Sequence, residues 1–395
     1  MQPAMKVRNP NFNIFDFLST SEGQLEDLLR RITAALQLTP AQYALIDQRY
    51  KGITNYLDAP GSPLAVHDPH MFPQGSRALR TTVKPWDRQE FDLDFVMKLR
   101  RPLRRFQAKE LLMELYSWLK QNGNYEHMLE RKKRCVRLSY ANEFHIDILP
   151  ALPDPERGGT CILVPCMKNG GQGEWSPSNP EGYVGWFNGR SNLAMWEKAL
   201  VAMKAQVDPL PALLQLHEIP PLKVTVQLLK RQRDVTFNAT MDLAPISIVL
   251  TTLAGEHYRG AQSVTVALTD CLDDICNEVH RTQGALVVRN PTNPDEILSE
   301  RWLEDQSLYD VFKHWLFAFS ARWSQVLEAR GPELPRLLKE LFGVNVVDHA
   351  LKQQANVVHA TRKAGLLSVA PTGILAVGDR PGKAVRVQEH RFYGS

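Results

Sequence analysis

Two aspartates within a short apolar stretch constrain the fold of this chain more than any other feature. In "FDLDF", Phe91, Leu93 and Phe95 alternate with Asp92 and Asp94. An alternation of period two predicts a strand, with the apolar side chains on one face and both carboxylates on the other. The chain therefore requires a sheet that buries one face and gathers acids on the opposite face.

A second stretch of the same kind carries a third aspartate. In "EFHIDILPA", residues 143–151, the apolar side chains share one face and leave Asp147 on the other. Three carboxylates on neighbouring strands are oxygen ligands suited to Mg²⁺ or Mn²⁺. Two such ions ~3.5–4 Å apart would hold the attacking hydroxyl and the leaving pyrophosphate of an in-line displacement. We therefore predict that Asp92, Asp94 and Asp147 are metal ligands and catalytic residues.

A Gly-Ser pair precedes the acidic strand. Gly75 and Ser76 are separated from Asp92 by residues 77–91. Glycine lets a backbone approach a triphosphate closely, the N–H groups of a following helix start can bind its oxygens, and Ser76 adds a hydroxyl donor. No Gly-Lys-Ser/Thr follows, so a P-loop NTPase is not indicated.

The rest of the chain is mainly helical by its periodicity, with loop-rich and extended parts. Residues 153–192 are predicted to be mostly loop, and residues 363–395 an extended tail. Helices are predicted at 25–36, after Pro40, and at 107–121, 193–206, 220–233, 245–258, 264–281, 296–330, 334–342 and 347–357. The expected organisation is a catalytic lobe over 1–205, which includes the N-terminal helices, and a helical lobe over 206–362.

Composition excludes several classes of protein. No apolar run approaches the ~20 residues of a membrane span, and the N-terminus lacks the pattern of a signal peptide, so the expected location is the cytoplasm. The five cysteines are too few and too scattered for a disulfide framework in 395 residues. Cys161 with Cys166 and Cys271 with Cys276 are expected to be buried thiols rather than zinc ligands, since no histidine accompanies them.

Charge is nearly balanced but locally clustered. The formal net charge is +4, too small for general coating of nucleic acid. Basic residues gather in "LRRPLRRF" (99–106) and "ERKKRCVRL" (130–138). Each cluster could face polyphosphate or nucleic acid, or form the solvated ends of helices and strands.

These motifs together resemble the DNA polymerase β-like nucleotidyltransferases, whose pattern is Gly-Ser, then Asp-x-Asp between apolar residues, then a distal Asp. More narrowly, the chain resembles the bacterial cGAS/DncV-like nucleotidyltransferases, the second-messenger synthases of CBASS anti-phage systems. Further stretches carry the narrower resemblance, namely 174–187, 224–237, 244–258 and 287–302. The resemblance implies an α+β fold, with a polymerase β-like lobe of mixed sheet and helices and a helical, oligoadenylate-synthetase-like C-terminal lobe.

The resemblance also implies an activity and further site residues. The family joins nucleoside triphosphates into cyclic di- or trinucleotides with release of pyrophosphate. The resemblance implies two Mg²⁺ or Mn²⁺ ions here, with ATP as a substrate and GTP or another NTP as a candidate second substrate. Gln74, Gly75 and Ser76 would cradle the triphosphate, and Lys230 and Ser247 of the second lobe would reach it from the opposite side. A lysine ammonium and a serine at a helix start suit these roles. Without the resemblance, Lys230 is a solvated helix residue and Ser247 a plain N-cap.

The resemblance extends to protein partners. The last residues, "VQEHRFYGS", resemble tails that an E1/E2-like enzyme conjugates through a terminal glycine, which would be Gly394, although Ser395 follows it. A regulatory peptide-binding protein or an activating nucleic acid would be a further partner, and the downstream effector would be reached only through the messenger. No membrane partner is expected.

Two other functions use the same sequence features. A polymerase β-like transferase that adds nucleotides to RNA or AMP to a protein would keep the same carboxylates, but the motifs of the second lobe favour the synthase. A catalytically inactive, nucleotide-sensing module would have no reason to hold three like charges together without cations.

Overall fold

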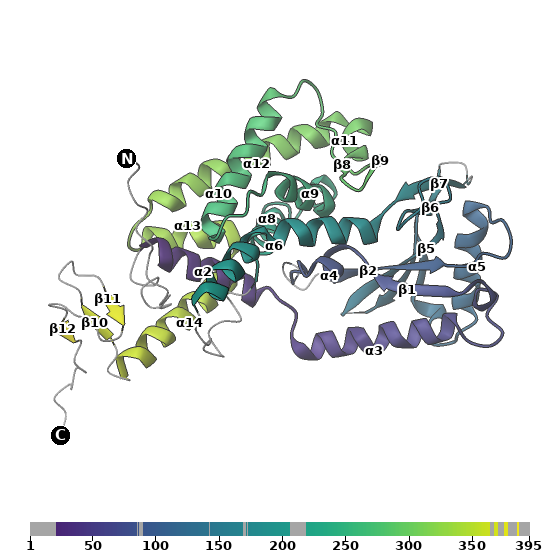
Figure 1. Cartoon of the computed structure of the whole chain (residues 1–395), viewed down its shortest axis with the longest axis horizontal. Helices are drawn as coiled ribbons and strands as arrows, with labels where there is room; N and C mark the ends of the chain where they lie inside the picture. The colour runs from purple at the N-terminus through teal and green to yellow at the C-terminus, as the bar shows by residue number, and fades with distance from the viewer. Residues whose placement is uncertain are drawn as a thin grey trace.

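The chain folds into two lobes, one built around a sheet and one of helices. The computed structural model describes residues 21–363, except residues 85, 87–89, 142, 169–170, 172 and 206–218, together with three short strands between residues 367 and 386. Figure 1 shows the two lobes side by side, with helix α6 (Pro180–Ala205) running from the sheet lobe into the helical lobe. This architecture confirms the predicted α+β class.

The sheet lobe contains a mixed seven-stranded sheet. Its strand order is β1-β2-β5-β4-β3, and β6 and β7 continue from β5. The strands are β1 (Pro69–Pro73), β2 (Phe91–Leu99), β3 (Leu129–Arg131), β4 (Val136–Tyr140), β5 (Phe144–Pro153), β6 (Ile162–Met167) and β7 (Gly173–Ser178). Strands β2 and β5 are parallel, and the other pairings in this sheet are antiparallel.

The alternation in β2 separates a buried face from the acidic face. Leu93 and Phe95 are buried, whereas Asp92 is exposed. The apolar face packs against α3 (Pro40–Leu57) and α5 (Ala108–Lys120), which contribute to the same core. Burial of these large side chains, worth roughly 1.5–3 kcal/mol each, fixes the register of β2 and thereby the face on which its carboxylates lie.

The helical lobe has a separate core built around a long aromatic helix. It contains α2 (Ser21–Ala35), α8 (Pro221–Thr236), α9 (Ser247–His257), α10 (Val264–Arg281), α11 (Glu300–Glu304), α12 (Gln306–Glu328), α13 (Glu333–Phe342) and α14 (Val344–Lys363). Helix α12 buries Tyr309, Phe312, Phe319 and Trp323 in this core. Helix α2 packs against α14, α10 and α8, so the first described helix belongs by its contacts to the helical lobe.

The expectation of mostly loop over residues 153–192 is wrong, because β6, β7 and the first turns of α6 lie there. Asn179 caps α6, since its side-chain oxygen accepts the N–H of Gly182 at 3.0 Å, and Pro180 fills the first helical position. The low helix propensity of the glycines in this segment obscured the helix in the sequence. Packing of α6 against α8 and α9 outweighs that propensity.

The single helix expected over residues 296–330 is also corrected. Strand β9 (Asn293–Ile297), which pairs with β8 (Arg289–Asn290), occupies the start of that range. Asp305 then interrupts the helix with extended dihedral angles and accepts the N–H of Ser307 at 2.9 Å, so it separates α11 from α12. An aspartate that bonds its neighbouring backbone is a common N-cap, and it competes with helix continuation.

Short strands lie in the expected tail. Strands β10 (Leu367–Val369), β11 (Leu375–Val377) and β12 (Val385–Arg386) pair antiparallel in the order β11-β10-β12. Gly394 and Ser395 lie outside the described residues, so conjugation of the tail stays a prediction. Within the described residues, no helix combines the length and the apolar character that crossing a membrane requires.

A buried glutamate ties α2 to the start of α10. Glu26 is 2% exposed, accepts the N–H groups of Val264 at 2.9 Å and Thr265 at 3.0 Å, and pairs with Arg30 at 2.9 Å. Burial by itself would raise the pKa of Glu26, but Arg30 and the two N–H groups lower it below its ordinary value. Glu26 therefore supplies the negative charge that the N-terminus of α10 favours.

Replacing Glu26 with Gln is expected to lower the free energy of unfolding by about 2–4 kcal/mol, because it leaves Arg30 and the end of α10 without their charged partner. Since the carboxyl has a depressed pKa, its contribution is present above the pKa of the unfolded chain and is lost as the pH falls through the folded value. Urea unfolding at neutral and acidic pH measures both effects. Glu22→Gln, at an exposed position of the same helix, is the control, and an equal loss in both variants would contradict the prediction.

Candidate active site

The parallel pairing of β2 with β5 brings the three predicted aspartates together. Asp94 lies directly opposite Asp147 in the strand register, and Asp92 lies opposite His145. Because side chains alternate across a strand, Asp92, Asp94 and Asp147 share one face of the sheet. Residues more than fifty positions apart in the chain thus become neighbours at one site.

Burial and mutual repulsion raise the pKa values of two of the carboxylates in this site. Burial, followed by the charges of Asp147 and Asp92, raises the pKa of Asp94 to about 7. Burial also raises the pKa of Asp92, although Arg137 opposes this rise. Like charges gathered in a partly buried site disfavour ionisation unless a cation compensates them. The site therefore has an excess of negative charge that invites positively charged ligands.

Arg137 of β4 supplies part of the compensation. Its Nε and one terminal nitrogen each donate to Asp147 at 2.7 Å, and the guanidinium also contacts Asp92 at 3.0 Å. The register places Arg137 directly opposite Asp147. The sequence interpretation placed Arg137 in the basic cluster 130–138 without assigning it to the site, although its alternation with Val136 and Leu138 placed it on one face of a strand.

Two further side chains border the acids. His145 is 2.9 Å from Glu90 through its Nε2 atom. The thiol of Cys135 forms a hydrogen bond with Asp147, and burial raises the pKa of this thiol. Neither residue was predicted from the sequence, because nothing in the chain before folding links them to the Asp-x-Asp motif.

The Gly-Ser segment lies against the acidic strand. Gln74 donates its N–H to the carbonyl oxygen of Asp94 at 2.9 Å, and Gly75 begins the short helix α4 (Gly75–Leu79). Gly75 has φ of +56°, and a Cβ built on it would lie 2.7 Å from Oδ2 of Asp94. Only glycine fits this contact without displacing the carboxylate. Ser76 lies next in α4, and its Oγ is 3.2 Å from Oγ1 of Thr82.

Lys230 of α8 reaches this segment from the helical lobe. It is buried and donates to the carbonyl and hydroxyl oxygens of Thr81, at 3.2 and 3.1 Å. Burial, with a contribution from Arg233, lowers the pKa of Lys230 to about 7, while the charge of Asp94 opposes the decrease. Lys230 is therefore buried against Thr81 and close enough to Asp94 to feel its charge, and the alternative of a solvated helix residue is wrong.

Ser247 is less directly connected to the other predicted residues. It starts α9, and its hydroxyl oxygen accepts from Arg233 at 2.6 Å. Arg233 lies one helical turn after Lys230 on α8 and also pairs with Asp234. Arg233 therefore joins Ser247 to α8, the helix that carries Lys230, and sequence reasoning missed this arginine.

The carboxylate oxygens are the kind of ligand that divalent cations prefer, although the carboxylates do not enclose an ion as they stand. Among the described residues, no three His, Cys, Asp or Glu side chains converge closely enough to hold one. Both oxygens of Asp147 accept from Arg137, and the raised pKa of Asp94 marks negative charge that this guanidinium leaves uncompensated. Hard, oxygen-only ligands of this kind suit Mg²⁺ or Mn²⁺.

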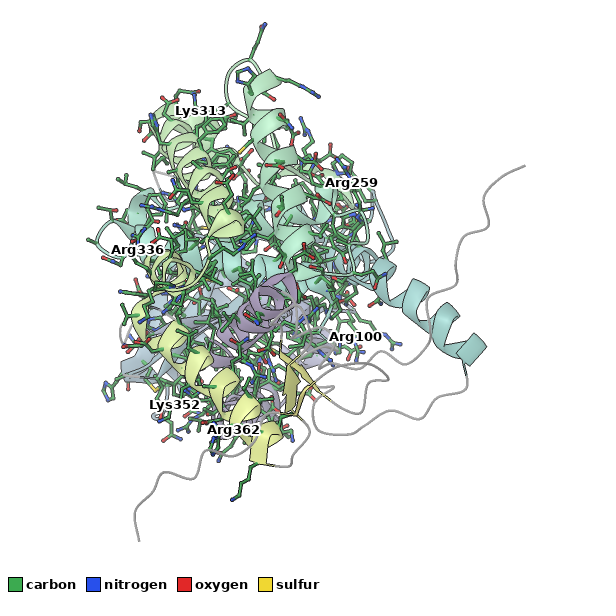
Figure 2. The ribbon with its side chains drawn as sticks, turned by 90° about the vertical axis from the view of Figure 1, so that its left-hand side faces the viewer. Arg100, Arg259, Lys313, Arg336, Lys352 and Arg362 are labelled. Carbon is green, nitrogen blue, oxygen red and sulfur yellow. The ribbon has the colours of Figure 1, made fainter. Side chains whose placement is uncertain are left out.

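Several residues of the two basic clusters pair with neighbouring acids. In the first, Arg100 pairs with Asp68 and Arg104 pairs with Glu114. In the second, Arg134 pairs with Glu300 of the helical lobe. Figure 2 shows that the labelled basic side chains of the outer helical lobe are scattered over several helices rather than gathered in one patch.

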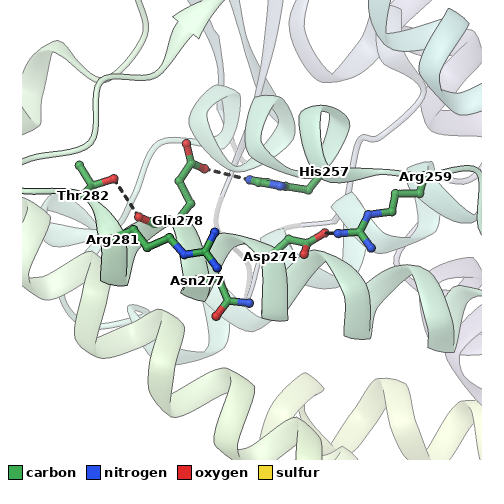
Figure 3. A pocket seen from close by; sticks show the side chains of 7 residues that line it. All are labelled: His257, Arg259, Asp274, Asn277, Glu278, Arg281 and Thr282. Atoms are coloured by element: carbon green, nitrogen blue, oxygen red, sulfur yellow. Dashed lines mark hydrogen bonds and ion pairs between the residues drawn. The ribbon is translucent and has the colours of Figure 1, made fainter.

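A cavity of about 560 Å³ lies elsewhere in the helical lobe, between the end of α9 and α10. Figure 3 shows its charged groups in pairs, His257 with Glu278 and Arg259 with Asp274. The cavity is lined by His257, Arg259, Asp274, Asn277, Glu278, Arg281 and Thr282. None of these residues is among the site residues predicted from the sequence.

Comparisons with known proteins find a matching family model and related proteins. A family model described as the Second Messenger Oligonucleotide or Dinucleotide Synthetase domain matches residues 24–191. A c-di-GMP synthase of Roseivirga ehrenbergii is 29% identical over 95% of this chain and 99% of its own length. The cyclic dinucleotide synthase CdnG of Bradyrhizobium diazoefficiens is 27% identical over 83% of this chain and 82% of its own length.

Similarity to solved structures supports the same fold. The structure of CdnG from Bradyrhizobium diazoefficiens in complex with GTP superposes with a TM-score of 0.67 at 23% identity, covering 84% of this chain and 99% of that one. At this level of identity the likeness concerns the fold, which is the two-lobed arrangement described above.

Proposed function

The chain is a cGAS/DncV-like nucleotidyltransferase, and from this premise we propose that it makes a cyclic dinucleotide second messenger from nucleoside triphosphates. One observation carries the proposal. Asp94 lies in register with Asp147, beside Asp92 and against Gly75, so the acids and the Gly-Ser segment form one site. An inactive sensing module has no need of this excess negative charge.

The reaction joins two nucleotides and then closes a ring. A ribose hydroxyl oxygen of one nucleotide forms a bond to the α-phosphorus of the other, the bond to the bridging oxygen breaks, and pyrophosphate leaves while the hydroxyl proton passes to a base or to solvent. A second transfer within the linear intermediate closes the ring and releases a second pyrophosphate. Each step needs alignment and charge neutralisation more than covalent help from the protein.

Each predicted residue has a role in this scheme. Asp92, Asp94 and Asp147 would hold two Mg²⁺ or Mn²⁺ ions, which when bound would neutralise the developing charge and activate the attacking hydroxyl. Gln74, Gly75 and Ser76 bring backbone and hydroxyl donors beside Asp94. Lys230 would offer a cationic donor from the helical lobe once it is protonated, and Ser247 is joined to the same helix through Arg233.

We propose GTP as a substrate. The two curated relatives are named as a c-di-GMP synthase and as CdnG, and the first is similar over 95% of this chain. This proposal narrows the sequence-based expectation, which named ATP first and left GTP or another NTP open. Cyclic di-GMP is the product that these names favour, and anti-phage defence is the setting that the family resemblance implies.

The test is a synthesis assay with purified full-length protein. Each labelled NTP, and every pair of NTPs, is incubated with Mg²⁺ or Mn²⁺, treated with phosphatase and analysed by chromatography and mass spectrometry. A phosphatase-resistant product with the mass of cyclic di-GMP from GTP alone supports the proposal. Transfer of nucleotides to added RNA or of AMP to protein, with no cyclic product in the presence of DNA, RNA or cell extract, would overturn it.

Nucleotide binding is expected to take up protons through Lys230. Because burial lowers its pKa to about 7, Lys230 is mostly neutral at pH 8, and a neighbouring triphosphate restores its proton. The affinity for NTP should therefore fall as the pH rises from 6 to 9. Isothermal titration calorimetry in buffers of different ionisation enthalpy should show uptake of up to about one proton per nucleotide.

Lys230→Met should abolish this component of the proton uptake. The control is Lys223→Met, because Lys223 lies on the same helix but bonds Asn188 instead of Thr81. Equal proton uptake in wild type and Lys230→Met would place the triphosphate away from Lys230.

A further inference from the structure

One cation already occupies the carboxylate site. Within the described part of the chain, Arg137 is the basic side chain that forms ion pairs in the carboxylate site, with two hydrogen bonds to Asp147 and one contact with Asp92. Its side chain is 19% exposed, and those of Asp147 and Asp92 are 14% and 52% exposed. Arg137 is thus a largely buried counter-ion with a path to solvent beside Asp92.

This contact determines which ligand atoms are free. A guanidinium that donates through two nitrogens to one carboxylate occupies both of its oxygens, so Asp147 is committed to Arg137 rather than to a shared ion. Among the described residues, the three carboxylates do not converge on a common point. One guanidinium balances one of the three negative charges, and Asp94 has no hydrogen bond to it.

The planar fork of arginine matches phosphate as well as carboxylate. When divalent cations and a nucleotide enter, the cations satisfy the carboxylates, and the released guanidinium can donate to a phosphate oxygen instead. Arg137 cannot fully bind a carboxylate and a phosphate at the same time, because the same N–H groups would donate to both. Such an exchange makes the binding of metal and nucleotide mutually favourable.

We propose that Arg137 is a positioning residue that holds Asp147 and Asp92 as their counter-ion until a divalent cation and a nucleotide arrive together, and that it thereby couples the two binding events. Without nucleotide, Arg137 competes with the cation for Asp147. With nucleotide, that competition is removed. This inference rests on the carboxylate site of the proposed function.

The test measures Mn²⁺ binding directly, by electron paramagnetic resonance of free Mn²⁺ with the full-length protein and without turnover. In the absence of nucleotide, Arg137→Gln should bind Mn²⁺ on the order of tenfold more tightly than wild type, because a competing positive charge is gone. With a non-hydrolysable GTP analogue, wild type should gain affinity for Mn²⁺ and Arg137→Gln should gain little. Arg137→Lys, which keeps the charge but loses the fork, should fall between them.

Two controls separate the possible failures. Lys133→Gln, at an exposed position of the same basic segment that forms no ion pair with any residue the structure describes, should behave as wild type. The double variant D92N/D94N should lose Mn²⁺ binding altogether, and normal binding by that variant would overturn the carboxylate site itself. Loss of binding in D92N/D94N together with unchanged Mn²⁺ affinity and coupling in Arg137→Gln would overturn the role of Arg137 alone.

Thermal unfolding keeps the test decisive if Arg137→Gln is unstable. Because its carboxylates lack their counter-ion, metal-free Arg137→Gln should unfold at a lower temperature than wild type. Added Mn²⁺ should stabilise this variant more strongly than wild type. If Arg137→Gln does not fold without metal, the same comparison is made with Arg137→Lys. Equal stabilisation of wild type and both variants by Mn²⁺ would contradict the proposal.

Discussion

Replacing Asp94 with Asn is expected to lower cyclic dinucleotide synthesis by about 10³-fold or more and, at the same time, to stabilise the metal-free protein. Activity is lost because an amide binds a divalent cation only weakly and does not neutralise its charge. Removal of several kcal/mol of transition-state stabilisation corresponds to the expected decrease in rate. The gain follows because Asp94 lies at the centre of the acidic face, opposite Asp147 and against Gly75.

The sign of the stability effect follows from the pKa. Burial and the neighbouring aspartates raise the pKa of Asp94 to about 7, above the ~3.9 of an unfolded chain. The folded protein therefore binds more protons than the unfolded chain between these values, and its stability falls as the pH rises through that window. Asn carries no such charge, so the melting temperature of metal-free Asp94→Asn should exceed that of wild type at pH 8 by at least about 2 °C.

Differential scanning fluorimetry with and without Mg²⁺, next to the synthesis assay, measures both effects. Asp273→Asn, at an exposed position of α10, is the matched control and should change neither activity nor stability. If Asp94→Asn retained activity within tenfold of wild type, the assignment of the carboxylates would be wrong. A drop in the melting temperature would contradict the electrostatic account of the site.

Gly75→Ala is expected to lower synthesis by on the order of 10²-fold while the protein stays folded. The new Cβ would lie 2.7 Å from Oδ2 of Asp94, so either the carboxylate or the Gly-Ser backbone must shift. A displacement of this size at reacting groups costs about two orders of magnitude in rate. The synthesis assay gives the loss in rate, and urea unfolding gives the loss in stability, which should be about 1–2 kcal/mol from the left-handed backbone.

A second glycine separates backbone strain from the contact with Asp94. Gly159 has φ of +58°, close to the +56° of Gly75, but a Cβ on it would meet nothing within 4 Å. Gly159→Ala should therefore show the same strain and retain near-normal activity. Equal loss of activity in the two variants would mean that the contact with Asp94 is unimportant.

Local patterns in the sequence predicted the parts of the site that a strand or turn specifies by itself. The alternation in "FDLDF" placed Asp92 and Asp94 on one face, and the same rule placed Asp147 on one face of its own strand. Bounds of α10 were predicted at residues 264–281, where the structure has Val264–Arg281. Each of these elements buries one face, and the regular spacing of its apolar residues shows that face in the sequence.

Features that depend on long-range contact were missed or mistaken. The first turns of helix α6 were not predicted from the sequence, because the stability of this part of the helix comes from packing. Trp186, for example, packs so closely against Gly255 that a Cβ there would lie 2.5 Å from the ring. Arg137 was noticed only as one member of a basic cluster, since its partner Asp147 lies on another strand. The support that Thr81 and Arg233 give to Lys230 and Ser247 also joins distant segments.

The sequence by itself determined the chemical types of the site, namely three carboxylates on strand faces and a Gly-Ser turn ahead of them, because short-range periodicity and backbone sterics encode these. Only the tertiary structure decided which groups meet. The parallel register of β2 and β5 sets Asp94 opposite Asp147, β4 delivers Arg137 to both acids it contacts, and α8 buries Lys230 near Asp94. Electrostatic coupling depends on separation in space, and the pKa values of Asp94 and Lys230 therefore have no counterpart in the linear chain.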